Sequence, residues 1–403
     1  MARYGCRTQT TTVGSMCSSQ KVILGSAVIE LKGRAIASGG EGSIHRHPLI
    51  HDRALKLFRQ SSATRSAKLA SMVAMASPNG SGRIICTWPE ELAFAAHSRS
   101  RRHACVGYSM PLIVGAKSLY EVVVPHRRPP RVDTGFLLTV GRNIASAMNS
   151  IHSHDVVIGD VNDMNVIVRP DGSVVFVDCD SYQIRAGGRV FRCLVGRPEF
   201  TSPELQGKSF RRRDRDVHCD YFALGVIEFR LLMEGNHPFA SGCSVSGTRL
   251  HPHALIARGL WPHRRGGVPG YPVRKACPPL SSLSAPLQEM MRRCFEEGCR
   301  NRAARPSPTE WAQVLDDALV NWKPTRRSRR KVVVPMPRAV KNVSTGRGRG
   351  AIGRTAKRII MRCLVLCIAA LAGLLVGIVL GTVESAADWV NPVQTWCRTL
   401  VGL

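Results

Sequence analysis

The chain of 403 residues has few acids, with 28 Asp and Glu against 57 Lys and Arg, and its net charge is +29. A chain of this charge is attracted to anionic surfaces, which include phospholipid, nucleic acid and acidic proteins. Aromatic residues make up only 6%. The hydrophobic fraction of 44% is nevertheless that of a globular protein, so disorder of the whole chain is excluded. The length suffices for one large two-lobed domain or for two ordinary domains.

The 14 cysteines include no C-x-x-C pair, and none of them belongs to a matched cluster with histidine. This spacing argues against zinc and against a disulfide framework, so we expect reduced thiols in a reducing compartment. No long apolar run follows the basic residues at the N-terminus, so we do not expect a cleaved signal peptide. The sequence also lacks an internal repeat.

Acidic residues are missing from residues 323–362, which contain 14 Lys and Arg. Subtracting these 14 from +29 leaves +15 for the rest of the chain. The runs RRSRRK and GRGRG and the weak apolar periodicity predict a flexible cationic linker. Anionic membrane lipid is the favoured partner of this linker, because an apolar run follows it at once. Nucleic acid bound by the RGRG run is a less favoured partner, and a merely solvated tether is the third interpretation.

Charge is also absent from residues 363–383. A helix of that length would be about 30 Å long, which is one hydrocarbon thickness. We therefore predict a transmembrane helix, with a buried core helix as the alternative. Four basic residues lie just before this run, so the positive-inside rule places residues 1–362 in the cytoplasm and residues 384–403 outside as a short tail. Gly373 and Gly377 form a G-x-x-x-G pair, which would permit a homodimer of this single-pass protein.

The pattern of residues 20–322 is globular, and residues 1–19 precede it as an N-terminal extension. Strands and turns are predicted in the first third, followed by a helix over residues 62–77 and strand-like pieces at 84–88 and 104–110. Helices dominate the remainder. A β-rich first third and a helical remainder predict a two-lobed α+β enzyme.

Three polar residues could carry chemistry. Asp160 and Asn165 lie five residues apart in the turn GDVNDMN, and Asp178 ends the strand SVVFV. The turn RPDG joins the two strands into a hairpin, so acceptor side chains would lie at neighbouring strand ends. Such a group could hold a divalent cation with oxygen ligands, or one carboxylate could accept a proton from a hydroxyl. A turn rich in Asp and Asn is often only a turn.

These motifs resemble the protein-kinase superfamily, and the match runs in order along the globular part. The segment from Ile158-Gly159-Asp160 to Asn165 resembles the catalytic loop H-R-D-x-x-x-x-N. The segment Asp178-Cys179-Asp180 resembles the metal-binding D-F-G. The sequence looks most like a divergent bacterial subfamily, and the resemblance implies a two-lobed kinase-like fold.

Other residues fit motifs that support the fold of the family. Glu204 in SPEL resembles the Glu of A-P-E, and Asp220 in DYFALG resembles the Asp of a helix in the C-lobe. Arg305 in NRAARPS resembles the late Arg that pairs with the A-P-E Glu. The resemblance therefore implies a structural role for these three residues.

The resemblance also implies a nucleotide site. Gly39, Gly40 and Gly42 in ASGGEGSI fit the glycine-rich loop, although its first glycine is replaced. Lys56 in ALKLF fits the strand lysine that reaches the α- and β-phosphates of ATP. Met110 would start the hinge that meets adenine.

The implied reaction is transfer of the ATP γ-phosphoryl group to a hydroxyl of a protein substrate. Asp160 would take the proton of that hydroxyl, and Lys56 would bind the phosphates. Asp178 and Asn165 would hold Mg²⁺ or Mn²⁺. Most of the catalysis would then be positioning and charge neutralisation.

The catalytic loop departs from the family pattern. Ile158 and Gly159 replace its His and Arg, so a phosphate on the activation segment has no obvious partner. Asn162 replaces the Lys that lies near the γ-phosphate in serine/threonine kinases, and Asp180 replaces the Gly of D-F-G.

The helix predicted over residues 62–77 contains no acid. Active kinases usually offer a Glu there to pair with the strand lysine, whereas Lys68 lies in this helix. Glu90 or Glu91 could substitute. Two functions therefore remain open: an active, divergent protein kinase, or an inactive pseudokinase that binds nucleotide or a partner as a scaffold.

Two other polar segments are given simpler interpretations. RRRDRD, residues 211–216, is predicted to be a solvated face, with attraction of an acidic substrate as the alternative. His152 and His154 are predicted to end a helix, where cations are favoured.

Overall fold

The computed structural model describes residues 20–31, 33–80, 82–96, 105–130, 132–242 and 250–323, which belong to one compact unit. The N-terminal extension 1–19, the linker beyond residue 323, the predicted transmembrane helix 363–383 and the tail lie outside these residues. No helix within the described ranges is long and apolar enough to cross a membrane.

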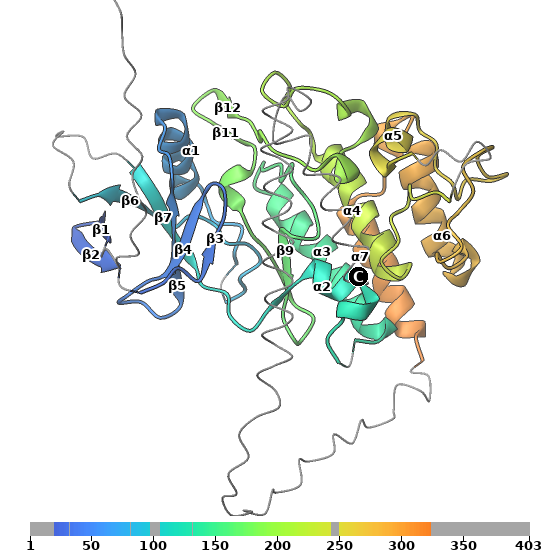
Figure 1. The fold of residues 1–403 in the computed structure, drawn as a ribbon, viewed down its shortest axis with the longest axis horizontal. Coiled ribbons are helices and arrows are strands. Elements are labelled where there is room, and N and C mark those ends of the chain that lie inside the picture. The colour runs from blue at the N-terminus through green and yellow to red at the C-terminus, as the bar shows by residue number, and fades with distance from the viewer. Residues whose placement is uncertain are drawn as a thin grey trace, which may run out of the picture. The chain divides into compact units, whose positions relative to one another are not determined.

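Seven antiparallel strands form the sheet of the N-lobe in the order β2-β1-β6-β7-β5-β4-β3 (Figure 1). Their bounds are β1 Gln20–Leu24, β2 Ala27–Leu31, β3 Ala37–Ser38, β4 Gly42–Arg46, β5 Arg53–Phe58, β6 Glu91–Ala95 and β7 Cys105–Pro111. Side chains alternate between the two faces of a strand. Leu55 and Leu57 of β5 therefore enter a small core with β1 and β2, whereas Ala54 joins the main core. The same alternation places Lys56 on the face of Ala54.

Helix α1, Ala63–Ala74, packs against this lobe and lies within the predicted range. Ser62 caps it by accepting from the N–H of Arg65 at 3.1 Å. The buried face of α1 carries Leu69, Met72 and Lys68. The helix therefore brings a cation into the interior of the domain.

The prediction of a strand at 84–88 is wrong, because the next strand is β6. The side chain of Asn79 accepts from the N–H groups of Ile85 and Cys86 and donates to the carbonyl of Cys86. These backbone groups are thus satisfied by a side chain, and only an isolated bridge from Cys86 to Phe176 remains. The piece predicted at 104–110 is confirmed as β7.

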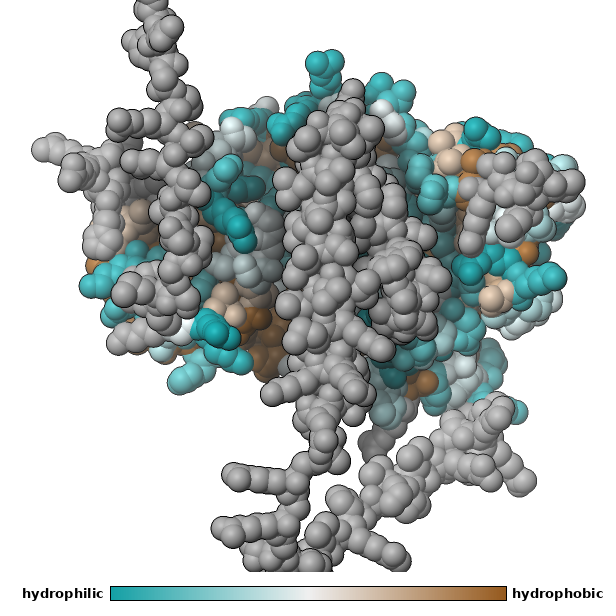
Figure 2. All heavy atoms as spheres, viewed as in Figure 1, coloured by the Kyte–Doolittle hydropathy of each residue, from teal (hydrophilic) through white to brown (hydrophobic). Residues whose placement is uncertain are grey.

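The C-lobe is helical, as predicted, with α3 packed against both α4 and α7. The helices are α2 Leu119–Val123, α3 Thr134–His152, α4 Val217–Leu232, α5 Pro252–Ala257, α6 Ala285–Arg292 and α7 Pro308–Asn321. Phe222, Phe229, Phe239 and Phe295 stack in the core of this lobe. On the face seen in Figure 2, most coloured residues are hydrophilic, in keeping with an apolar interior.

Two hairpins follow α3 in the chain. β9, Val166–Val168, pairs with β10, Val174–Phe176, and with β8, Lys117–Ser118, so the predicted hairpin is confirmed. Its turn contains Gly172 with φ of +82°, a value that favours glycine. β11, Ile184–Ala186, pairs with β12, Arg189–Phe191. The chain therefore has the predicted two-lobed α+β fold in its described part.

Candidate active site

Lys56 lies at the centre of the site. Its side chain is buried, and its ammonium donates to Oδ1 of Asp178 and, at 2.6 Å, to Oδ1 of Asp180. Burial disfavours the ammonium form, but the two carboxylates outweigh this effect and raise the pKa of Lys56. The lysine is therefore a fixed positive charge where β5 of the N-lobe meets the segment that follows β10, a region that we call the cleft.

Asp180 supplies the acid that helix α1 lacks. Its Oδ1 accepts from the hydroxyl of Tyr108 at 2.7 Å as well as from Lys56, and its backbone carbonyl accepts from Nζ of Lys68 at 2.6 Å. Burial alone would raise the pKa of Asp180, but Lys56, Tyr108 and Lys68 outweigh it and lower this pKa. Burial also lowers the pKa of Lys68, to about 8. The strand lysine and the helix lysine thus converge on one residue.

The proposal that Glu90 or Glu91 replaces the helix acid is wrong. Glu90 pairs with Arg53 at 3.1 Å, and the carboxylate of Glu91 lies beside Gly25. Both glutamates lie at the start of β6, which β7 separates from the β5 strand of Lys56. The sequence contains a signal for the role of Asp180 as the partner of Lys56. An acid occupies the Gly position of the D-F-G motif, and helix α1 contains the cation Lys68 in place of an acid.

Asp160 is held from both sides by amides. One carboxylate oxygen accepts from Nδ2 of Asn162 and the other accepts from Nδ2 of Asn165, each at 3.0 Å. Asn162 is fully buried, and its Oδ1 accepts from the N–H of Met164 at 2.9 Å. Burial raises the pKa of Asp160, against the effect of both amides. Asn162, which sequence reasoning counted only as a missing lysine, therefore orients Asp160.

Asn165 directly precedes β9 and Asp178 follows β10 by two residues, and the N–H of Val177 donates to the carbonyl of Asn165 at 2.9 Å, so the two residues lie at neighbouring strand ends. Asp178 has φ of +64°, which is uncommon outside glycine, although Asp tolerates it better than most residues. Ser181 holds this turn by donating its hydroxyl to the carbonyl of Asp178 at 2.8 Å. The side chain of Asp178 stays 38% exposed, and its oxygens and that of Asn165 are suitable ligands for Mg²⁺.

The predicted glycine-rich loop is the turn between β3 and β4. The N–H of Gly39 donates to the carbonyl of Gly42 at 2.9 Å. Among the described residues, no atom lies within 4 Å of the position that a Cβ would take at Gly39 or Gly40. A Cβ at Gly42 would collide with the carbonyl of Leu57, so glycine is required there for strand pairing. Met110 is buried beside Ala54, one residue before β7 ends.

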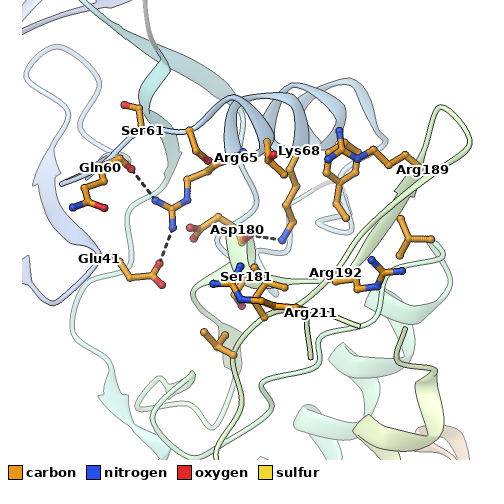
Figure 3. Close-up of a pocket in the computed structure, with 16 residues that line it drawn as sticks. Glu41, Gln60, Ser61, Arg65, Lys68, Asp180, Ser181, Arg189, Arg192 and Arg211 are labelled. Atoms are coloured by element: carbon orange, nitrogen blue, oxygen red, sulfur yellow. Dashed lines mark hydrogen bonds and ion pairs between the residues drawn. The ribbon is translucent and has the colours of Figure 1, made fainter. Parts of the chain in front are cut away.

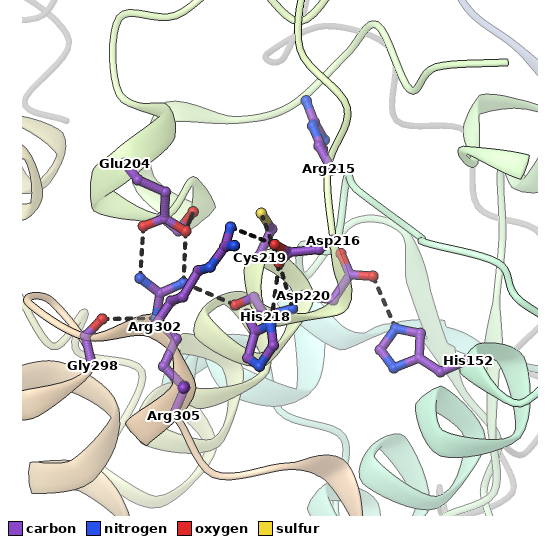
Figure 4. A network of polar contacts seen from close by, with 12 residues as sticks. His152, Glu204, Arg215, Asp216, His218, Cys219, Asp220, Gly298, Arg302 and Arg305 are labelled. Atoms are coloured by element: carbon purple, nitrogen blue, oxygen red, sulfur yellow. Dashed lines mark hydrogen bonds and ion pairs between the residues drawn. The ribbon is translucent and has the colours of Figure 1, made fainter. Parts of the chain in front are cut away.

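Asp220 fixes the catalytic loop to helix α4. Its carboxylate accepts from the N–H groups of Ile158 and Gly159, both at 2.8 Å, and contacts Nε2 of His152 at 2.9 Å (Figure 4). His152 is the last residue of α3, as predicted. Two helices therefore position the backbone that leads into Asp160.

Arg215 fills the space beside Gly159. It is buried, donates to the carbonyl of Gly159, and donates to the carbonyl of Val195 at 2.6 Å. Its guanidinium lies 3.9 Å from the ring centroid of Phe210. A Cβ at Gly159 would lie 2.7 Å from this guanidinium. The segment around Val195 is therefore held to the catalytic loop by an arginine from another part of the chain.

The solvated face predicted for residues 211–216 is confirmed for residues 211–214, which are exposed, but is wrong for the last two residues. Arg215 is buried, and Asp216 is the N-cap of α4. The reason is the start of α4 directly after this run, which draws the last residues into the fold.

Glu204 and Arg305 form a bidentate pair in the C-lobe, with donor–acceptor distances of 2.8 and 2.7 Å (Figure 4). Arg305 also donates to the carbonyls of Gly298 and His218. Burial alone would raise the pKa of Glu204, but Arg305 outweighs it and lowers this pKa. The pair ties the segment after the cleft to the base of the lobe.

Comparison with known proteins agrees with this arrangement. Residues 123–317 match the protein kinase domain. The matched region contains Asp160, Asn165 and Asp178 and most of the C-lobe. Over these residues the chain is therefore similar to the protein kinase domain.

Two bacterial relatives are similar over a longer part of the chain. Protein kinase YegI of Escherichia coli strain K12 is 32% identical over 311 residues, which are 75% of this chain and 46% of that protein. Protein kinase YegI of strain O157:H7 is 34% identical over 294 residues, 70% of this chain and 44% of that protein. A PAS domain-containing serine/threonine-protein kinase of Mus musculus is 27% identical over 135 residues, 32% of this chain and 9% of that protein. The chain spans less than half the length of the two bacterial relatives.

Proposed function

We propose that this protein kinase domain is active and transfers the γ-phosphoryl group of ATP to a hydroxyl of a protein. The observation that carries the proposal is the contact of Lys56 with Asp178 and Asp180. Active kinases need the strand lysine held by an acid. Asp180 provides that acid, so the lack of Glu in α1 is compensated within the site.

The residues of the cleft fit ATP and a divalent cation. Lys56 would bind the phosphates, and the open backbone at Gly39 and Gly40 leaves room for them. The oxygens of Asp178 and Asn165 would hold Mg²⁺ or Mn²⁺. The cation, when bound, neutralises negative charge on the phosphates.

Asp160 would accept the proton of the substrate hydroxyl. The amides of Asn162 and Asn165 hold both of its carboxylate oxygens, so its orientation is set before substrate binds. Burial raises its pKa, which makes the carboxylate a better proton acceptor. Asp220 and Arg215 act through the backbone of this loop as positioning residues.

A nucleotide-binding scaffold without activity is the second candidate. Asn162 provides no positive charge near the γ-phosphate, and Lys56 contacts the carboxylate of Asp178 directly. Such a protein would bind nucleotide and transfer nothing. The two candidates differ in turnover and not in binding.

The full chain should be incubated with γ-labelled ATP and Mg²⁺ or Mn²⁺, and transfer to itself and to added proteins should be followed. We expect Asp160→Asn and Asp178→Asn to lower transfer at least about a hundredfold, because each removes a charge from the reacting centre. Asp171→Asn, an exposed acid in the hairpin turn, is the matched control. Nucleotide binding without transfer, or transfer that survives both substitutions, would contradict the proposal.

We further propose that residues 363–383 anchor the domain in a membrane as a single pass, with residues 323–362 on anionic lipid. Support comes from the uncharged run and the 14 cations that precede it. Deleting residues 360–403 should move the chain from the membrane to the supernatant. Retention of the shortened chain in membranes, once aggregates are removed, would argue against the anchor.

A further inference from the structure

A cavity of about 570 Å³ lies between helix α1 and the segment that follows Asp178. Figure 3 shows that its charged lining comes from parts of the chain far apart in sequence. Five cations line it: Arg65, Lys68, Arg189, Arg192 and Arg211. We call this site the cationic cavity.

The positive charge of the cationic cavity is only partly neutralised. Among its lining residues the acids are Glu41 and Asp180, and the carboxylate of Asp180 is already occupied by Lys56 and Tyr108. Within the described ranges, no carboxylate lies within ion-pair distance of Arg189 or Arg211. A ligand with negative charge would therefore find unpaired guanidinium groups.

Arg65 and Arg192 do have carboxylate contacts, but both are exchangeable. Arg65 lies 3.6 Å from Glu41, whose side chain is 53% exposed, and Arg192 is bonded to Asp214 at 2.7 Å on the surface. Exposed pairs of this kind contribute little to stability. The guanidinium of Arg192 can therefore turn toward a ligand at small cost. That of Arg65 also donates to the carbonyl of Gln60 at 3.0 Å and lies 4.5 Å from the ring centroid of Phe58, so it is held in place at the cavity.

The start of α1 adds to the same effect. Ser61, Ser62 and Thr64 line the cavity, so the first turn of α1 and the positive end of the helix dipole lie beside it. Apolar residues also line the cavity, among them Leu194 and Val195, which are 49% and 37% exposed. Charged and apolar lining together suit a peptide better than a small inorganic ion.

The position of the cavity indicates which peptide would fill it. Ser181 is part of its wall, and the Ser181 hydroxyl is bonded to the carbonyl of Asp178. Asp178 is in turn close enough to Asp160 for its charge to raise the pKa of Asp160. A polypeptide whose hydroxyl reaches Asp160 would therefore extend toward this wall. The natural occupant is thus the protein substrate.

We propose that the cationic cavity binds an acidic segment of the protein substrate and selects substrates by it. The anionic groups would be carboxylates of Asp and Glu, or phosphate groups on the same polypeptide, since arginine binds both in bidentate fashion. This inference rests on the proposed kinase function and adds its substrate class.

Binding can be tested without catalysis. The full chain carrying Asp160→Asn should be titrated with a labelled peptide rich in Glu, and with versions that carry Gln, Lys or phosphoserine instead. We expect the Glu and phosphoserine peptides to bind at least about tenfold more tightly than the Gln peptide, with affinity that falls as salt rises. The phosphoserine arm separates phosphate from carboxylate recognition. Equal affinity for the Glu and Gln peptides would overturn the proposal.

Reversing the charge of two cavity arginines tests whether the peptide binds in the cationic cavity. Arg189→Glu with Arg211→Glu should weaken binding of the Glu peptide by at least about tenfold, which is 1.4 kcal/mol, and should favour the Lys peptide instead. Arg265→Glu reverses an exposed arginine of the C-lobe that does not line the cavity and should change binding by less than about twofold. An equal loss in both variants would assign the effect to net charge and overturn the proposal.

Kinetics separate this proposal from the proposed function. In the chain that keeps its natural Asp160, Arg189→Glu with Arg211→Glu should raise KM for an acidic substrate peptide. The same two substitutions should leave KM for ATP unchanged. A chain that transfers no phosphate but keeps charge-selective binding would refute the kinase proposal alone. A chain that transfers phosphate equally well to acidic and neutral peptides would refute the cavity proposal alone.

Discussion

The Glu204–Arg305 pair of the C-lobe and the Lys56–Asp180 pair of the cleft both hold a buried cation against a carboxylate. In the C-lobe, the partners stand at the sequence positions that the family motifs assign to them. In the cleft, the acid has moved from α1 to the segment after Asp178, and α1 contributes Lys68 instead. The comparison shows that a buried cation has a carboxylate partner in both clusters, even where the partner comes from a different position in the sequence.

The two clusters also differ in geometry. Arg305 uses two nitrogens on Glu204 and further N–H groups on two carbonyls, so its guanidinium is almost fully engaged. Lys56 shares one oxygen of Asp180 with Tyr108 and contacts Asp178 as well. The Glu204–Arg305 cluster is suited to stabilise the fold. In the Lys56–Asp180 cluster, Lys56 can give up a contact and bind a ligand instead.

The largest effect on stability is expected from breaking the C-lobe cluster. Arg305→Met would leave Glu204 without its partner, and breaking a buried pair in this way costs about 3 kcal/mol. The free energy of unfolding from denaturant titration measures the loss. Arg302→Met is the matched control, because Arg302 is 58% exposed in its pair with Asp216 and exposed pairs contribute about 0–1 kcal/mol. Similar losses in both variants would mean that the Glu204–Arg305 pair does not hold the lobe.

A somewhat smaller effect, on activity, should follow from removing the acid of the cleft. Asp180→Gly deletes a hydrogen bond to the Lys56 ammonium, so we expect kcat/KM for ATP to fall about tenfold to a hundredfold. Adding Lys68→Glu should return the acid to α1 and recover much of the loss. The kinetic constants of both variants should be measured beside their stability.

Lys68→Ala on the same Asp180→Gly background is the control for this rescue. It removes the helix cation without supplying an acid. If it rescues as well as Lys68→Glu, the effect of Asp180 is not that of a partner for Lys56, and the comparison of the two clusters fails.

The smallest effect concerns Glu228 of α4, which is buried. Unlike the acids of the two clusters, neither of its oxygens has a hydrogen-bond partner among the described residues. Burial raises its pKa to about 8, from 4.5 in the unfolded chain. The folded state therefore keeps its proton to higher pH, so its contribution to stability is full below about pH 4.5 and is lost as pH rises toward about 8.

Glu228→Gln should remove this dependence. Between about pH 7 and about pH 8, the free energy of unfolding should fall by about 1 kcal/mol more in the wild-type protein than in the variant. The comparison with the variant cancels all other titrating groups. Parallel pH profiles would show that Glu228 is not buried as an acid.

Much of the fold could be predicted from local pattern. The helix of α1, the hairpin turned at Gly172 and the helical C-lobe follow from periodicity and turn residues, which are properties of neighbouring residues. The strand predicted at 84–88 failed, because the side chain of Asn79 satisfies the backbone of Ile85 and Cys86. A single polar side chain of this kind is invisible to periodicity.

The sequence by itself determined the order of the motifs. It also made Asp160, Asn165 and Asp178 candidates, because spacing along the chain indicates which side chains share a strand end or a turn, and the resemblance to the protein-kinase superfamily implied Lys56. Only the tertiary structure decided their partners. Asp180 meets Lys56 across 124 residues, and Arg215 meets Gly159 across 56. Such contacts depend on how lobes and loops pack, and burial makes an unpaired charge costly. Each buried charge is therefore paired with a group that is close in space, whatever its distance along the chain.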